Sequence, residues 1–240
     1  MKFLVAITSF VGFLMVVLPG LLYQFFGLDL GTAFTVFRYG VYVGGAALVL
    51  ILLQVLFARK SMRLGATFIY ALLALVAVGL PLSMMNKGKS VPPIHDITTD
   101  TQNPPQFDAI LPLRKDAPNP ATYAGGEITE QQLRAYPDIK TQVFALSIEE
   151  LFPVAVNSVE ALGWEIAAKN TTNYTIEATD TTLWFGFKDD VIIRLTAQGE
   201  DTLVDIRSKS RVGKSDLGKN AERIQLFFKT LRERTNSPAN

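Results

Sequence analysis

Three long apolar runs near the amino terminus restrict the fold of this chain more than any other feature of its sequence. They cover residues 3–26, 33–57 and 64–85. A bilayer core of roughly 30 Å is crossed by about 20 helical residues, and each run is long enough to do so. Only 19% of all residues are charged, against about 25% in a typical soluble domain. The sequence therefore predicts a membrane region, residues 1–86, with three transmembrane helices.

The positions of Lys and Arg predict the orientation of these helices. Lys2 precedes the first run, and Arg59, Lys60 and Arg63 crowd the loop between the second and third, whereas the first loop has neither residue type. Short loops rich in Lys and Arg stay in the cytoplasm, so the amino terminus is expected there and the chain after residue 86 on the far side. A cleaved signal peptide is the alternative for the first run, but the run is too long and lacks an A-x-A cleavage site.

The composition changes abruptly after the third run. Residues 87–135, here called the strap, are rich in proline and predict an extended segment that leads from the bilayer to a folded domain. The strap also carries apolar residues that a free linker would not need, so packing along the domain is the alternative. The chain has no cysteine, and a packed core must therefore stabilise the exported part without disulfides.

Residues 136–240 have the pattern of an α+β domain. Ser147 and Glu150 form a capping box for a helix that ends at Gly163. A second helix is expected after Ser215 or Asp216, and its apolar residues fall on one face. Strands separated by turn residues are expected at 164–168, 174–179, 183–187 leading on to 191–197, and 203–208. The sequence predicts an antiparallel sheet with two helices on one face, following the three transmembrane helices.

The stretch "RSKSRVGKSDLGKN" contains a GKS triplet that raises the question of a phosphate-binding loop. A Walker A loop has glycine five residues before the glycine of GK, and here Ser208 stands there. The loop would also lie on the far side of the membrane from ATP. What remains is a strand leading into a helix start, which can bind an anion through unpaired N–H groups and nearby cations. The candidate ligand-binding residues are Arg207, Lys209, Arg211, Lys214, Ser215, Asp216 and Asn220.

Structural ion pairs are the alternative for the same cations, and the sequence favours them. Asp205, Arg207, Lys209 and Arg211 alternate with small or apolar residues, so they share one face of a strand. Cross-strand pairing would join the aspartates to the arginines without any ligand. The aspartates are Asp189, Asp190 and Asp205, and the arginines Arg194, Arg207 and Arg211.

Several separated motifs suggest a family. "IHDITTD" followed by "PPQF", then "FGFKDDVIIRL" and "VDIRSKSRVGKSDLGKNAERI", all after apolar helices, resemble the bacterial membrane proteins grouped as domain of unknown function 1499. The resemblance covers most of residues 94–231. It implies a protein of the bacterial inner membrane with a periplasmic domain, but no activity.

The stretch "IHDITTD" holds the only histidine. His95 with Asp96 and Asp100, and Asp189 and Asp190 from the folded domain, could bind a divalent metal or supply a base for hydrolysis. Docking of the strap by local turns is the alternative for these residues. The sequence favours the second reading, because no nucleophile motif accompanies the histidine and no cofactor is indicated.

These observations favour a membrane-anchored periplasmic binding or scaffold module over an enzyme. Its candidate partners, besides the lipid bilayer, are an envelope protein and an anionic envelope component. Residues 1–86 carry five basic residues and one acidic residue, and the rest of the chain 18 against 21, so the exported part is not expected to bind nucleic acid. A metal-assisted envelope hydrolase using His95 and the nearby aspartates is the alternative function.

Two further features leave alternatives open. Gly40, Gly44 and Gly45 allow close helix packing at G-x-x-x-G spacing, so the helices themselves could be a subunit of a membrane complex. The apolar stretch "LWFGF" favours a central strand, with an apolar ligand groove as the alternative.

Overall fold

A computed structural model describes residues 1–236 of the chain, apart from the side chain of Ser61. The chain divides into two compact units, one made of Met1–Lys89 with Leu183–Gly186 and the other of Ser90–Thr182 with the residues from Phe187 onward. The first unit is helical and the second contains a sheet with helices, so the predicted fold class is confirmed.

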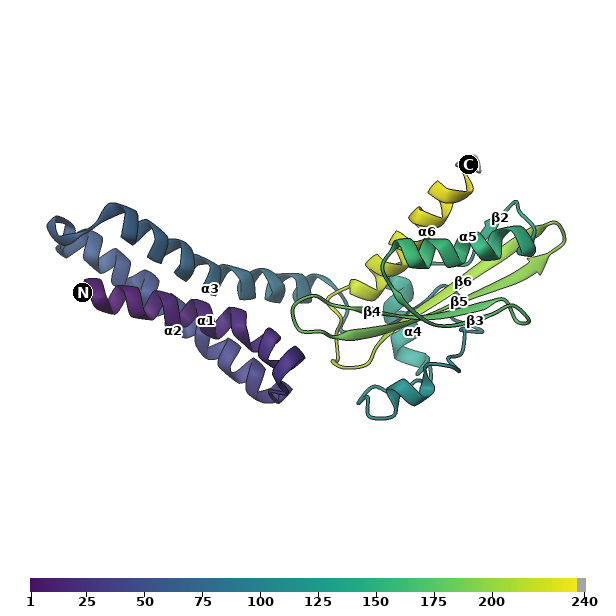
Figure 1. The fold of residues 1–240 in the computed structure, drawn as a ribbon, viewed down its shortest axis with the longest axis horizontal. Helices are drawn as coiled ribbons and strands as arrows, with labels where there is room; N and C mark the ends of the chain where they lie inside the picture. Colours follow the sequence, from purple (N-terminus) through teal and green to yellow (C-terminus); the bar gives the residue numbers. More distant parts are fainter. Residues whose placement is uncertain (237–240) are drawn as a thin grey trace. The chain divides into compact units, whose positions relative to one another are not determined.

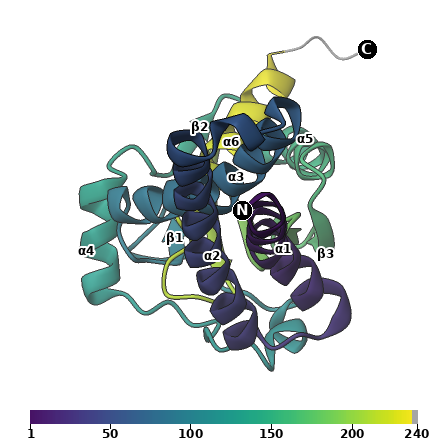
Figure 2. The ribbon, with the colours of Figure 1, turned by 90° about the vertical axis from the view of Figure 1, so that its left-hand side faces the viewer.

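The helical unit contains three helices long and apolar enough to cross a membrane. They are α1 (Lys2–Phe26), α2 (Leu30–Phe57) and α3 (Leu64–Ser90), with a short 3-10 turn, η1 (Arg59–Ser61), between the last two. Gly27 ends α1 in the left-handed conformation, at φ 70°, and Asp29 caps α2 by accepting a hydrogen bond from the Thr32 N–H at 2.8 Å. Helices α1 and α2 lie side by side (Figure 2).

Glycines let these helices approach closely. A Cβ atom on Gly12 of α1 would lie 2.8 Å from the backbone nitrogen of Gly44 in α2, and one on Gly44 would lie 2.7 Å from the Cβ of Ala77 in α3. Gly40, one turn before Gly44, faces the Met15 region of α1 equally closely. The G-x-x-x-G spacing therefore marks a packed helix face, whereas Gly45 has open space beside it.

Substituting Gly44 with Leu is therefore expected to disrupt the helical unit. The added side chain would collide with Ala77 and crowd Val78 of α3, and overpacking of this kind costs about 1–3 kcal/mol. We expect the melting temperature of the full chain in detergent micelles to fall by about 5 °C or more. Gly45→Leu is the matched control, since a Cβ there meets nothing within 4 Å. An equal fall for both variants would contradict the packing.

The second unit is built on one antiparallel sheet. Its strands follow the order β1-β6-β5-β4-β3, and the short strand β2 also pairs with β6. The strands are β1 (Asp96–Thr98), β2 (Gln142–Phe144), β3 (Glu165–Asn170), β4 (Thr175–Thr181), β5 (Lys188–Gln198) and β6 (Asp201–Ser210). The helices are the 3-10 turn η2 (Leu111–Arg114), α4 (Gly126–Ala135), α5 (Ile148–Ala161) and α6 (Lys219–Thr235).

The sheet has two helices on one face and part of the strap on the other. Helices α5 and α6 cover one face (Figure 1). Helix α4 lies beside the edge strand β1, where the Gln132 side chain bonds to the backbone of Thr98. The main core lies under α5 and α6 and includes Leu151, Ile193, Ile206 and Phe227. The capping box of Ser147 and Glu150 that starts α5 is present as predicted. Phe107 and Ile110 of the strap form a smaller cluster against Ile192 on the other face.

The structure corrects three local expectations. The strap is not simply extended, because it supplies strand β1 to the sheet as well as η2 and α4. The predicted strand 183–187 is instead the turn between β4 and β5, with Gly186 at φ 63° and Leu183 94% exposed. Helix α6 begins at Lys219 after Gly218, later than a cap at Ser215 or Asp216 would place it.

Candidate functional site

Arg207 forms the centre of a buried ion-pair network between the sheet and the strap. Its side chain is 0% exposed, and its Nε and Nη2 atoms donate to the two carboxylate oxygens of Asp96, both at 2.9 Å. It also donates to the backbone carbonyls of Pro105 and Ala121 in the strap. The Phe107 ring lies 5.1 Å from the guanidinium carbon. Arg207 therefore binds β6 to β1 and to the strap through bidentate, charge-assisted bonds.

Lys209 joins the same carboxylate. Its Nζ donates to Asp96 Oδ2 at 2.7 Å and to the Thr122 carbonyl at 2.9 Å. Burial lowers the pKa of Lys209 below its ordinary value, although Asp96 acts in the opposite direction. The neighbouring guanidinium groups of Arg207 and Arg114 lower the pKa of Lys209 further.

Asp190 is the second centre of the network. It is fully buried on β5 and accepts hydrogen bonds from Arg114 of the strap, from Arg211 just after β6, and from Thr179 of β4. Arg211 also donates to the Leu113 carbonyl. One carboxylate therefore holds two arginines from segments far apart in the sequence.

Arg194 links two further aspartates at the other end of the same face. Its Nη2 lies 2.9 Å from Asp205 Oδ2 and 3.1 Å from Asp100 Oδ2. Burial alone would raise the pKa of Asp100, but the backbone N–H groups of Asn103 and Gln102 and the guanidinium of Arg194 lower it below its ordinary value. The strap turn at Asp100 is thereby attached to β5.

Glu177 holds the strap without a cation. This β4 carboxylate is buried and accepts hydrogen bonds from the backbone N–H groups of Asp108, Ala109 and Ile110, at 2.9–3.2 Å. Glu177 was not predicted as a site residue, because a charged residue in the mixed strand TIEATDT gives no local sign of its partners.

Asp189 belongs to a separate cluster on the opposite face. Arg223 of α6 donates to Asp189 and Asp180, each at 2.7 Å, and also to Asn220. Asn220 is buried and donates to the His95 carbonyl and to Ser210. The predicted pairing of Asp189 with sheet arginines is therefore not what the structure shows.

The predicted basic loop is divided between buried and exposed residues. Arg207 and Lys209 are buried in the network and Arg211 is nearly so, whereas Lys214 is exposed and takes part in no ion pair among the described residues. Ser215 and Asp216 accept hydrogen bonds from backbone N–H groups at the start of α6, Asp216 from both Gly218 and Asn220. Burial raises the pKa of Asp216.

The residues proposed for metal binding or catalysis do not converge. His95 Nδ1 lies 3.3 Å from the carbonyl oxygen of Lys214, while the neighbouring Asp96 is committed to Arg207 on the strap side of the sheet. Asp100, Asp189 and Asp190 each form an ion pair with a different arginine. Within residues 1–236, no group of three His, Asp or Glu side chains is arranged to hold a metal ion. The geometry gives the hydrolase hypothesis no support.

Comparison with known families agrees with the extent of this network. A family model described as "Protein of unknown function (DUF1499)" matches residues 96–231, more than half of the chain. The match begins at Asp96, the first residue of β1, and ends within α6, so it contains the whole ion-pair network. Comparison with curated proteins finds no match.

Proposed function

Because the chain belongs to the family of proteins of unknown function designated DUF1499, we propose its role from its structure: it is a membrane-anchored binding module and not an enzyme. The charged residues that could have formed an active site are already paired within the fold. They bind the strap to the sheet and so build a fixed platform. The function then depends on a surface that this platform leaves open.

The module is proposed to reside in the bacterial inner membrane with its sheet domain in the periplasm. The basic residues Arg59, Lys60 and Arg63 lie around the turn between α2 and α3, and Lys2 begins α1 at the same end of the helical unit. The positive-inside rule puts this end in the cytoplasm. An odd number of spans then carries the chain after α3 to the periplasm.

The observation that supports a protein partner is a groove between β2 and the end of α6. Its volume is about 410 Å³. The groove is lined by Gln142, Val143, Phe144, Ala145, Leu146, Arg232, Thr235 and Asn236. Val143, in the middle of β2, is 58% exposed. Among the described strands β2 pairs only with β6, so its other edge can accept an extended segment of a partner as an additional strand.

Site-specific photocrosslinking in intact cells tests this proposal. A photoreactive residue at position 143 is expected to give a discrete protein adduct, because its side chain opens into the groove. The matched control is position 226, where Leu226 on α6 is 49% exposed but does not line the groove. Absence of an adduct at 143, or the same adducts at both positions, would contradict a partner in the groove.

An anionic envelope component is a second candidate ligand, supported by Lys214. This exposed lysine lies in the loop before α6 and has no carboxylate partner among the described residues. The same crosslinking experiment separates the two candidates. A non-protein adduct from position 214, with none from position 143, would favour the anionic component.

A further inference from the structure

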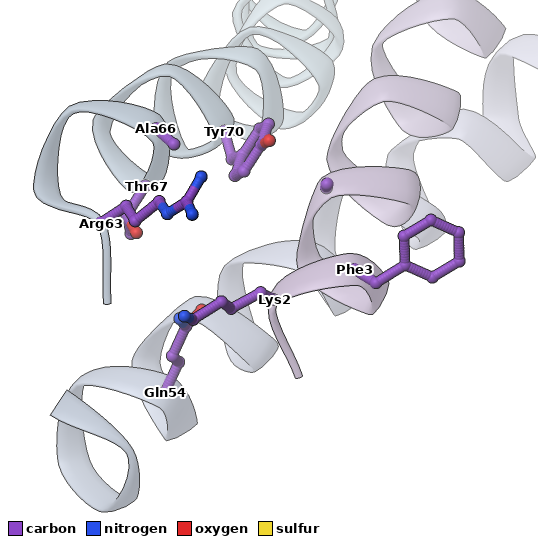
Figure 3. A pocket seen from close by; sticks show the side chains of 8 residues that line it. Lys2, Phe3, Gln54, Arg63, Ala66, Thr67 and Tyr70 are labelled. Atoms are coloured by element: carbon purple, nitrogen blue, oxygen red, sulfur yellow. The ribbon is translucent and has the colours of Figure 1, made fainter. Parts of the chain in front are cut away.

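A cavity of about 380 Å³ lies within the helical unit, at the end where α1 begins, α2 ends and α3 begins. It is lined by Lys2, Phe3, Ala6, Gln54, Arg63, Ala66, Thr67 and Tyr70. Figure 3 shows that Lys2 and Gln54 come from two helices on one side of the space and that Arg63, Thr67 and Tyr70 face them from the third. The proposed function does not use this cavity.

Gln54 is the most informative residue in the cavity. Its side chain is 2% exposed, and its Oε1 atom has no hydrogen-bond partner among the described residues. An unpaired buried acceptor costs about 1–3 kcal/mol, so native structures rarely keep one without a reason. Within an otherwise apolar last turn of α2, this oxygen is placed to accept a hydrogen bond from a ligand that enters the cavity.

The electrostatics of the cavity favour an anion. Lys2 and Arg63 contribute two positive charges to its lining, which contains no acidic residue. Neither cation forms an ion pair within the described residues. The amino-terminal ends of α1 and α3 both lie at this cavity and add unpaired N–H groups and positive potential.

The location favours a lipid over a free anion. The cavity lies at the ends of helices that are long and apolar enough to span a membrane, where phospholipid headgroups are found. Ala6, Ala66 and the Tyr70 ring supply apolar lining beside the two cations. Basic pockets between membrane helices are suited to anionic headgroups in this way.

We propose that this cavity binds the headgroup of an anionic glycerophospholipid that carries a free hydroxyl, of which phosphatidylglycerol is the simplest. Lys2 and Arg63 contact the phosphate, and a headgroup hydroxyl donates a hydrogen bond to Gln54 Oε1. The phosphate would explain why two cations line the cavity, and the hydroxyl would supply the hydrogen-bond donor that Gln54 Oε1 lacks. The bound lipid links α1, α2 and α3 at the end where loop η1 joins α2 to α3.

Native mass spectrometry of the full chain, released from nanodiscs of known lipid composition, tests the proposal. With equal phosphatidylglycerol and phosphatidylcholine, we expect the wild-type protein to retain phosphatidylglycerol preferentially. The double variant Lys2→Gln, Arg63→Gln should retain it at least about tenfold less, since two charge-assisted contacts are lost. Lys60→Gln, which removes an exposed cation outside the cavity, is the matched control and should retain it as the wild type does.

Gln54→Leu provides a second test that leaves every charge, and therefore the topology, unchanged. It should lower the preference for phosphatidylglycerol over phosphatidic acid, whose headgroup has no added hydroxyl, by about fivefold. Equal retention in Lys60→Gln and the double variant, or an unchanged preference in Gln54→Leu, would overturn the proposal. Displacement of the lipid by millimolar inorganic phosphate would also overturn it, because the site would then bind free phosphate.

Discussion

Substituting Asp96 with Ala is expected to lower the free energy of unfolding of the sheet domain by about 3–5 kcal/mol. The variant leaves two buried cations, Arg207 and Lys209, without their common carboxylate. Urea unfolding of the full chain in detergent micelles measures the loss. Fluorescence of Trp164, which is buried in the main core, reports on this domain in a Trp184→Phe background.

The matched control is another aspartate of the strap. Asp108 is exposed and bonds through its backbone, whose N–H donates to Glu177 and whose carbonyl accepts from the Leu111 N–H. Asp108→Ala is therefore expected to change stability by no more than about 0.5 kcal/mol. A loss of less than about 1 kcal/mol for Asp96→Ala would show that the pairing with Arg207 does not stabilise the domain.

Substituting Asp190 with Ala is expected to have an effect of similar size at the other centre of the network. Arg114 and Arg211 would both lose their carboxylate, and Arg114 is almost completely buried. Leaving buried charges uncompensated costs about 3–5 kcal/mol. Arg114 belongs to η2, which is part of the strap. We therefore also expect Asp190→Ala to increase the rate of hydrogen exchange, relative to the wild type, more in the strap than in α5.

Asp180→Ala is the control for this second variant. Asp180 is partly exposed, and its partner Arg223 keeps the buried Asp189 when Asp180 is removed. The expected loss is below about 1 kcal/mol. Similar losses of stability for Asp180→Ala and Asp190→Ala would mean that burial does not determine how much an ion pair stabilises the domain.

Features with a local cause could be predicted from the sequence. The three apolar runs specify membrane-length helices because helix length must match the bilayer. The capping box at Ser147 and the alternating charges of β6 depend only on residues close in sequence. The G-x-x-x-G spacing likewise marks a helix face that the structure shows to be closely packed at Gly40 and Gly44.

The partners of the charged residues could not be predicted, because they come from distant segments. Arg207 binds Asp96, which is 111 residues earlier in the chain, and Asp190 binds Arg114, 76 residues earlier. Only the path of the strap across the sheet brings these groups together. The sequence predicted a lattice of aspartates and arginines without assigning individual pairs. Arg194 and Arg211 do pair with aspartates of that lattice, whereas Arg207 pairs with Asp96 of the strap.

One wrong prediction and one unsupported alternative have identifiable physical causes. The stretch "LWFGF" has the composition of a strand, but Gly186 adopts a positive φ and the chain turns there. His95 and Asp96 are adjacent in an extended segment, and such neighbours point to opposite faces. Their side chains therefore do not converge, and the metal-site hypothesis gains no support from the structure.

The most direct test of the account is a double-mutant cycle that combines Asp96→Ala with Arg207→Met. If these side chains form a structural pair, removing Arg207 should relieve the uncompensated charge left by Asp96→Ala. The double variant should then be at least about 1.5 kcal/mol more stable than the sum of the two single losses implies. Losses that add to within about 0.5 kcal/mol would contradict the central claim that the charged motif is a buried structural network.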